Sequence, residues 1–186
     1  MNAYFLQRIN DIRRHPKEHL LGQLVATETE DGKLDDEELL SFCRLLLIAG
    51  NETTTGLITA SARIFHEEPD TLIQLKQNPQ LAKNFVEEAL RFYSPFSATV
   101  RRTTKDVEIA GQAIAAGELV IPLLASANRD ERVFEAPDTF RLDRSPKPHL
   151  GLGFGIHVCL GAHLARLEAK IVVEQMAERY RGIELV

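Results

Sequence analysis

The sequence predicts a mainly helical fold with small β-hairpins. Three observations carry this prediction: apolar residues recur at helical spacing in several long segments, the short strand candidates lie between residues 98 and 121, and glycines separate these strand candidates. The 186 residues are 44% hydrophobic and 26% charged, which is typical of one globular domain that buries a sizeable core.

Helical periodicity dominates the first half of the chain. Asp35 and Glu38 have the spacing of a capping box, with Asp35 as the capping acceptor, and open a long helix. Asn78 and Pro79 form a second start signal, and Asp70 is expected to cap a short helix before it. The helices expected in this half cover residues 5–15, 20–25 and 35–66, a short segment after Asp70, and residues 79–94.

The pattern changes after Pro95. Residues 129–158 look irregular and are rich in proline and glycine, and a loop of that length is usually functional when it is ordered. Short strands are expected over 98–101, 107–109 and 119–121, followed by a helical turn at 123–128. An amphipathic helix is expected from Leu160 to Tyr180, with Leu164, Leu167, Ile171, Val172 and Met176 on one face.

Charge and composition exclude several classes of function. The net charge is −5, so a nucleic-acid binder with a concentrated basic face is not expected. No apolar run approaches the ~20 residues that span a bilayer, and the N-terminus shows no secretory signal. Two cysteines cannot form a disulfide framework, so the expected location is the reducing cytoplasm, away from membranes.

One stretch of the long helix breaks local rules. Residues 45–49 are uniformly apolar and are expected to be buried. Directly after them, Gly50, Glu52 and Thr53 combine a weak helix former, an acid and a hydroxyl, as is common at functional sites. A ligand could lie against the helix at Gly50, beside the acid and the hydroxyl. The alternative is a helix kink or a helix-crossing point with a surface glutamate.

A second motif is weaker when it is taken alone. Glu88 and Arg91 lie on one face of a predicted helix, where they can pair. Exposed pairs of this kind are common and contribute only ~0–1 kcal/mol. Cys43 lies in an apolar turn and is expected to pack in the core.

The third motif is a glycine-rich loop that contains Cys159 and runs into the last helix. Gly151, Gly153 and Gly155 alternate along the loop and are expected to leave one side bare, so that a flat ligand can approach the backbone. The start of a helix favours a thiolate at Cys159, which is therefore a candidate nucleophile or metal ligand. His157 could serve as a base, a ligand or a hydrogen-bond donor. The alternative is a buried cysteine that packs as a small hydrophobic side chain.

Together, these motifs resemble those of the cytochrome P-450 family, in the style of its soluble bacterial members. Residues 153–161 look like the family's haem-binding loop, residues 49–54 resemble its oxygen-activating helix motif, and Glu88-x-x-Arg91 matches its helix pair. The resemblance covers essentially the whole chain but only the C-terminal half of a family member. It implies one partial domain over residues 1–186, with the N-terminal half and the last hairpin missing. Leu152 stands where the family usually has Phe, which is expected to alter packing around the sulfur.

The resemblance implies that Cys159 is the axial thiolate ligand of the iron in haem b (iron protoporphyrin IX). Glu52 and Thr53 would be the catalytic pair, in which Thr53 orients dioxygen and water and Glu52 relays protons from solvent. The implied cofactor-binding residues are Arg101 and His157 at the propionates, Gly153, Phe154, Gly155 and Gly161 along the loop, and Ala49 and Gly50 on the opposite face. Leu46 and Thr99 are expected to contact substrate, and Glu88, Arg91 and Arg144 are expected to form a buried structural cluster.

The implied function is a haem-thiolate monooxygenase that inserts one atom of dioxygen into a small organic substrate. Electrons would come from a separate ferredoxin or flavoprotein donor, and a missing N-terminal half is a further expected partner. One alternative is a non-catalytic haem-binding or interaction fragment of such an enzyme. Another is a hydrolase built on Cys159 and His157, for which no orienting Asp or Asn is indicated. A zinc site is less favoured because the ligand count is low.

Overall fold

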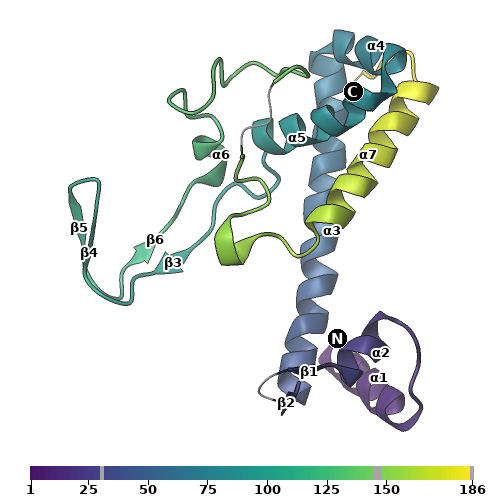
Figure 1. The fold of residues 1–186 in the computed structure, drawn as a ribbon, viewed down its shortest axis with the longest axis vertical. Coiled ribbons are helices and arrows are strands. Elements are labelled where there is room, and N and C mark those ends of the chain that lie inside the picture. Colours follow the sequence, from purple (N-terminus) through teal and green to yellow (C-terminus); the bar gives the residue numbers. More distant parts are fainter. Residues whose placement is uncertain (30–31, 145–147, 185–186) are drawn as a thin grey trace. The chain divides into compact units, whose positions relative to one another are not determined.

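A computed structural model describes residues 1–29, 32–144 and 148–184, and the chain divides into two compact units, Met1–Glu52 and Thr53–Val186. The predicted fold class is confirmed, because the described chain is mainly helical with small antiparallel strand pairs (Figure 1). The helices are α1 (Asn2–Arg14), α2 (Leu20–Ala26), α3 (Asp36–Glu67), α4 (Pro69–Gln77), α5 (Ala82–Phe92), α6 (Leu124–Ala127) and α7 (Ala162–Arg179), with 3₁₀ turns η1 (Pro79–Leu81) and η2 (Gly155–His157). The strands are β1 (Glu28–Thr29), β2 (Gly32–Lys33), β3 (Arg101–Arg102), β4 (Val107–Ile109), β5 (Gln112–Ile114) and β6 (Leu119–Val120).

The first unit contains α1, α2, the β1–β2 pair and the start of α3. The predicted capping box is confirmed, since the Glu38 amide donates to Asp35 Oδ1 at 2.8 Å and the Asp35 amide donates to Glu38 Oε2 at 2.9 Å. Cys43 is buried as predicted, together with Ile9, Ile12 and Leu39. These four side chains form the apolar interior of the unit.

The predicted burial of residues 45–49 is wrong for this structure. Leu45, Leu47 and Ile48 are 55%, 52% and 59% exposed, and Ala49 is exposed as well. The stretch lies in the first unit, after Cys43, which is the last buried apolar residue of that unit, so the core of the first unit does not cover it. Glu52 is also exposed, so its carboxylate bears no large desolvation cost here.

The second unit has one hydrophobic core, made by the end of α3 with α4, α5 and α7. Phe85 of α5 stacks on Phe65 of α3, with ring centroids 4.9 Å apart, and meets Phe140 edge-on at 5.3 Å. Phe140 and Leu142 belong to the irregular segment that begins after α6, so this segment is tied into the core by its own side chains. Residues 145–147 of that predicted irregular region lie outside the described residues.

Helix α7 buries a different face from the leucine-rich one that the sequence emphasises. Ala169, Val173 and Ala177 are buried, whereas Leu164 and Leu167 are 59% and 53% exposed. Because alanines allow close approach, α7 lies against α4 and α5 along its small side chains. The helix begins at Ala162, two residues after the predicted start.

Three smaller predictions need correction. Asp70 does not cap α4, because Pro69 occupies the first helical position and Asp70 lies in the first turn. Helix α5 ends at Phe92, before Ser94, and the strand expected over 98–101 is β3, shifted to Arg101–Arg102.

The β4–β5 hairpin reveals one missed strand. β4 falls on the predicted residues 107–109, and its partner β5 follows a two-residue turn formed by Ala110 and Gly111, with φ of 51° and 81°. Alanine rarely adopts a positive φ, so Ala110 did not indicate a two-residue hairpin turn in the sequence, and the strand after the turn was not predicted. Among the described residues, no helix combines the length and apolar character needed to cross a membrane.

Candidate functional site

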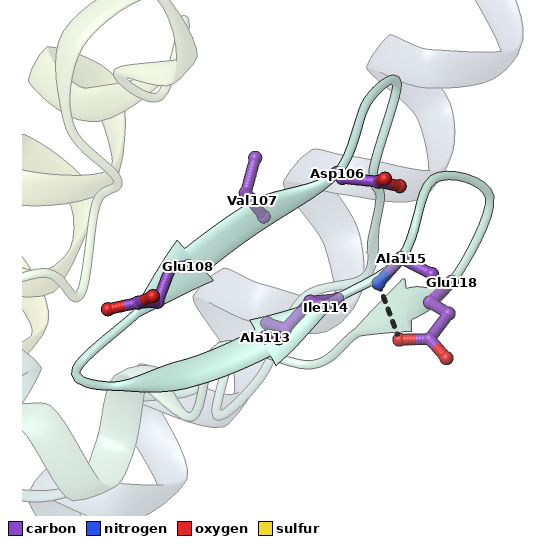
Figure 2. Close-up of a pocket in the computed structure, with 7 residues that line it drawn as sticks. All are labelled: Asp106, Val107, Glu108, Ala113, Ile114, Ala115 and Glu118. Carbon is purple, nitrogen blue, oxygen red and sulfur yellow. Dashed lines mark hydrogen bonds between the residues drawn. The ribbon is translucent and has the colours of Figure 1, made fainter.

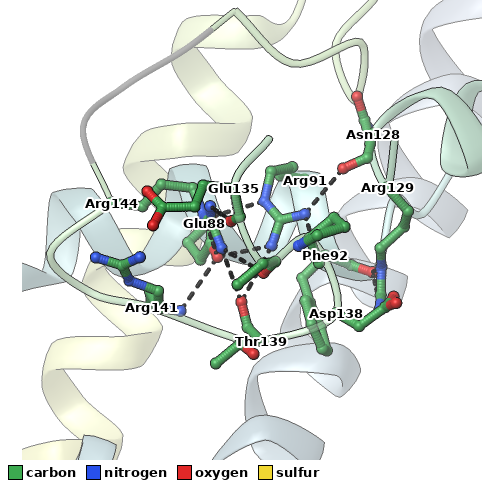
Figure 3. Close-up of polar contacts among 12 residues, drawn as sticks. Glu88, Arg91, Phe92, Asn128, Arg129, Glu135, Asp138, Thr139, Arg141 and Arg144 are labelled. Atoms are coloured by element: carbon green, nitrogen blue, oxygen red, sulfur yellow. Dashed lines mark hydrogen bonds and ion pairs between the residues drawn. The ribbon is translucent and has the colours of Figure 1, made fainter. Parts of the chain in front are cut away.

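The predicted cluster of Glu88, Arg91 and Arg144 is assembled in the second unit (Figure 3). Arg91 and Glu88 form a two-pronged pair on α5, with Nε–Oε2 and Nη2–Oε1 distances of 2.8 Å. Arg144 Nε donates to both oxygens of Glu88, at 2.9 and 3.0 Å. The side chains of Glu88, Arg91 and Arg144 are only 4%, 2% and 10% exposed, so this is a buried charge cluster and not a solvated pair.

The cluster also holds the irregular segment by its backbone. Arg91 Nη1 donates to the carbonyls of Asn128 and Pro137, at 2.8 and 2.9 Å. Arg144 reaches further carbonyls, including that of Thr139 at 2.9 Å (Figure 3). A guanidinium group can donate to several acceptors at once. Arg91 and Arg144 therefore satisfy backbone carbonyls of the irregular segment that have no partner in a helix or sheet.

The Cys159 loop presents its thiol to the surface. Cys159 is exposed, and its amide donates to the Leu152 carbonyl at 2.8 Å, which closes the loop on itself. The apolar side chains of Phe154 and Ile156 are 75% and 96% exposed. A large apolar surface of this kind is typical of a binding face.

The glycines of the loop have different roles from the one predicted. A Cβ on Gly151 would lie 2.6 Å from the Leu90 carbonyl oxygen, and one on Gly153 would lie 2.4 Å from the His157 carbonyl oxygen. These two glycines therefore permit close backbone contacts within the protein. Of these three glycines, Gly155, with φ +61°, is the one at which an added Cβ would meet no described atom within 4 Å, so Gly155 fits the predicted bare surface.

The stem of the loop is held by residues that the sequence analysis missed. Asn128 is 1% exposed; its Oδ1 accepts from the Leu150 amide at 2.7 Å and its Nδ2 donates to Ser94 Oγ at 2.7 Å. His149 and Arg166 both bind Glu87. These partners lie many residues apart in the chain, so no local pattern could reveal them.

Glu87 is the acceptor for two donors. His149 Nε2 lies 3.1 Å from Glu87 Oε2, and Arg166 Nε donates to Oε1 at 2.6 Å. Partial burial favours the neutral acid, but the hydrogen bonds from His149 and Arg166 outweigh it and lower the pKa of Glu87 to about 2. The pKa of Arg166 is raised, first by its hydrogen bond to Glu87, which outweighs the opposing effect of partial burial, and also by the charge of the Glu87 carboxylate.

The lowered pKa of Glu87 predicts acid sensitivity. An unfolded glutamate titrates near 4.5, so the native contacts of Glu87 add stability above that pH and lose it as the pH falls toward about 2. The full effect is on the order of 3 kcal/mol. Urea unfolding of the wild type and of Glu87→Gln, followed by circular dichroism, should show a stability difference at pH 7 that shrinks steadily below pH ~4.5. A difference that is constant between pH 7 and 3 would contradict this assignment.

Other predicted site residues of the second unit are accessible. Arg101 and His157 are exposed, and the Arg101 guanidinium donates to Thr99 Oγ1 at 2.8 Å and to the Val100 carbonyl at 2.9 Å. The predicted propionate ligand Arg101 and the predicted substrate contact Thr99 are therefore neighbours. Gly161 is exposed, and a Cβ on it would lie 4.0 Å from Cys159 Sγ.

The remaining predicted residues lie on α3, which continues across the boundary between the units. Leu46 is half-buried, and Gly50 is exposed, with no described atom within 4 Å of an added Cβ. Glu52 ends the first unit and Thr53 begins the second. Their proximity to the Cys159 loop stays a prediction.

A separate open hollow of about 460 Å³ lies along the β4–β5 hairpin (Figure 2). Glu118 Oε2 accepts from the Ala115 amide at 3.2 Å at its edge. None of the predicted site residues lines it. Within the described part of the chain, no group of three or more His, Cys, Asp or Glu could hold a metal ion.

Comparison with known proteins identifies the class to which this fold and loop belong. The family model described as Cytochrome P450 matches residues 62–183. The biotin biosynthesis cytochrome P450 of Bacillus subtilis is 44% identical over 183 residues, which cover 98% of this chain and 46% of that protein. Cytochrome P450 119 of Sulfolobus acidocaldarius is 46% identical over 171 residues, which are 91% of this chain and 46% of that protein.

Solved structures agree with the sequence relatives. Substrate-free CYP109E1 from Bacillus megaterium matches with a TM-score of 0.92 and 42% identity, over 96% of this chain and 46% of that one. P450BioI in complex with an acyl carrier protein ligated to hexadec-9Z-enoic acid matches with a TM-score of 0.90 and 45% identity, over 95% of this chain and 45% of that one. The chain belongs to the cytochrome P450 family, as its motifs predict, and it spans about half the length of the relatives it matches.

Members of this family bind haem b, and the residues around Cys159 fit such a group. The thiol is exposed and can ligate iron as a thiolate. The open backbone at Gly155 and the exposed Phe154 ring offer an apolar surface to a flat macrocycle. Arg101 and His157 are exposed donors that could bind carboxylates.

Proposed function

We propose that this chain supplies the haem-binding part of a cytochrome P450 monooxygenase, in which Cys159 would hold the haem iron through its thiolate. The observation that carries the proposal is an exposed cysteine on an open glycine loop, adjoining a buried Glu88–Arg91–Arg144 cluster. The relatives include the hydroxylase described as beta-dihydromenaquinone-9 omega-hydroxylase, which is 42% identical over 90% of this chain. Haem, when bound, supplies the activation of dioxygen for insertion of one oxygen atom into a substrate.

The protein's own residues have distinct tasks in this proposal. Cys159 would hold the iron through an anionic sulfur, and the loop backbone would limit the movement of that sulfur. Arg101 and His157 would bind the propionates as donors, and Phe154, Gly155 and Gly161 would face the group. Gly153 would shape the loop for binding through its close contact with the His157 carbonyl. On the α3 side, Ala49 and Gly50 leave room for dioxygen, Thr53 orients dioxygen and water, and Glu52 passes protons from solvent. Leu46 and Thr99 contact the substrate.

The proposal includes partners and a location that the sequence predicts. The substrate is a small organic molecule, and a separate ferredoxin or flavoprotein supplies the electrons, because hydroxylation with dioxygen consumes two electrons per turnover. The remaining half of a family member, carrying further substrate contacts, is a proposed partner. A cytoplasmic location stays a prediction from the cysteine content.

Titration with haem tests the assignment of Cys159. We expect wild type and Cys43→Ser to bind haem with the same thiolate-type absorption spectrum, because Cys43 is buried in the first unit. Cys159→Ser should lose that spectrum while keeping its circular dichroism. The same thiolate spectrum in Cys159→Ser would overturn the proposal.

A non-catalytic haem-binding fragment is the second candidate, and the exposed leucines of α3 and α7 favour it. Such large exposed apolar faces ordinarily mark surfaces that another chain or segment covers. A thiolate spectrum without oxidation of any substrate in the presence of an electron donor would support this candidate. Alkylation of Cys159 that abolishes a hydrolytic activity in haem-free protein would instead support the Cys–His hydrolase.

A further inference from the structure

We propose that Glu87 is a positioning residue for the Cys159 loop, which it clips at both ends by binding His149 before the loop and Arg166 after it. Residues Glu87, His149 and Arg166 are called the Glu87 clip here. The proposal rests on the proposed function, because it treats Cys159 as the haem ligand. The Glu87 clip is distinct from the Glu88–Arg91–Arg144 cluster. That cluster is built on the next residue of α5 and holds the irregular segment, not the Cys159 loop.

The first end of the clip depends on the two nitrogens of His149. Its side chain is 8% exposed, so both ring nitrogens need partners within the protein. Nδ1 accepts a hydrogen bond from the Gly151 amide at 3.1 Å, and a nitrogen that accepts carries no proton. Nε2 must therefore hold the proton of the neutral ring and donate it to Glu87 Oε2 at 3.1 Å. The His149 ring, in the tautomer with the proton on Nε2, thus links the backbone of the loop at Gly151 to the carboxylate of Glu87.

The second end of the clip lies on α7. Arg166 binds Glu87 with two prongs, Nε–Oε1 at 2.6 Å and Nη2–Oε2 at 3.1 Å. The two groups are 38% and 27% exposed, and charge-assisted pairs with this fork geometry are stronger and more directional than neutral ones. Arg166 lies in the first two turns of α7, shortly after Cys159 in the sequence. Its contact with Glu87 therefore fixes the start of α7 relative to α5.

The clip reaches Cys159 through short backbone contacts. Gly151, which His149 holds, lies so close to α5 that an added Cβ would be 2.6 Å from the Leu90 carbonyl oxygen. The next residue, Leu152, accepts the Cys159 amide at 2.8 Å. A single carboxylate thereby restrains both strands of the loop, and fixing the ends of a loop reduces the conformations open to the residues between them.

The restraint predicts a local effect that a general loss of stability would not produce. Releasing the clip should free the amides of the loop to exchange with solvent while α5 and α7 stay folded. It should also let the sulfur leave the iron more often in the haem-loaded protein. Both effects are measured at the Cys159 loop, and they come in addition to the change in global unfolding free energy that is expected for Glu87→Gln.

The test uses the full chain and compares Glu87→Gln, His149→Gln and His149→Asn with the control Glu174→Gln. Glu174 also binds a cation, Lys170, at 2.7 Å, and both of these residues lie on α7 outside the Cys159 loop. Glutamine at 149 retains a donor near the Nε2 position, whereas asparagine retains an acceptor near Nδ1. Hydrogen exchange of the haem-free chain is measured for the amides of Gly151 and Cys159, and carbon monoxide spectra are recorded after loading with haem and reduction.

We expect Cys159 amide exchange to be about tenfold faster in Glu87→Gln and His149→Asn than in Glu174→Gln. His149→Asn should keep the protection of the Gly151 amide, and His149→Gln should lose it. The haem-loaded clip variants should show a larger share of complex without the red-shifted Soret band that a thiolate ligand gives. Equal exchange at Cys159 in Glu87→Gln and Glu174→Gln would overturn the clip. If the exchange pattern is as expected but wild type gives no thiolate spectrum, the clip stands and the proposed function fails.

Discussion

Replacing Arg91 by alanine is expected to cost about 3–5 kcal/mol of unfolding free energy and to abolish haem binding. The substitution would remove one of the two ion pairs that the described residues make with Glu88, which is 4% exposed, and would leave the pair with Arg144. It would also remove the donor to the carbonyls of Asn128 and Pro137. Asn128 in turn holds the Leu150 amide, so the stem of the Cys159 loop would lose its support.

The measurement is urea unfolding of the second unit by circular dichroism, together with haem titration. Arg132→Ala is the matched control, because Arg132 also pairs with a carboxylate but its side chain is 85% exposed. Such a surface pair contributes only ~0–1 kcal/mol, so the control should unfold almost as wild type does. The structural role of the cluster would be contradicted if Arg91→Ala unfolded at the same urea concentration as Arg132→Ala, or if it retained haem.

Replacing Gly151 by alanine is expected to destabilise the second unit by about 1–3 kcal/mol and to displace the Cys159 loop. The added Cβ would lie 2.6 Å from the Leu90 carbonyl oxygen and 3.2 Å from its carbon. Both atoms belong to the backbone of α5, so rotation of a side chain cannot relieve the overlap. The loop must move instead, and with it the Leu152 carbonyl that accepts the Cys159 amide.

Gly182→Ala provides the control, because an added Cβ there meets no described atom within 4 Å. Gly151→Ala should lower the urea midpoint and weaken haem binding, whereas Gly182→Ala should leave both unchanged. Unchanged haem affinity in Gly151→Ala would show that the close contact with α5 does not determine the position of the loop.

Local signals predicted much of the fold. The capping box of Asp35 and Glu38 fixed the start of α3, and Asn78 accepts the Gln80 amide at 3.2 Å, as its position before Pro79 predicts. These features depend on neighbours within four residues, so their physics is contained in a short stretch of sequence. The motifs in family order predicted the family itself.

Burial was harder to predict because it depends on what covers each face. Residues 45–49 are apolar all round, yet they lie past the core of the first unit and are largely exposed. On α7, alanines are buried and leucines are exposed, although the leucines are the more hydrophobic. A sequence pattern shows which faces can be buried, whereas packing partners decide which ones are.

The polar contacts behind the Cys159 loop were not predictable for a related reason. His149 and Arg166 bind a carboxylate 62 and 79 residues away. The pair Glu87 and Glu88 reads as two ordinary helix carboxylates, although one holds the irregular segment and the other holds the loop. Only the folded arrangement distinguishes these two roles.

The carbon monoxide spectrum of the reduced, haem-loaded chain tests the central claim most directly. If Cys159 ligates the iron as a thiolate, the Soret band should shift strongly to the red, and the shift should vanish in Cys159→Ser but persist in Cys43→Ser. A spectrum without that shift in the wild type, at a haem content of one per chain, would contradict the claim that this sulfur holds the iron.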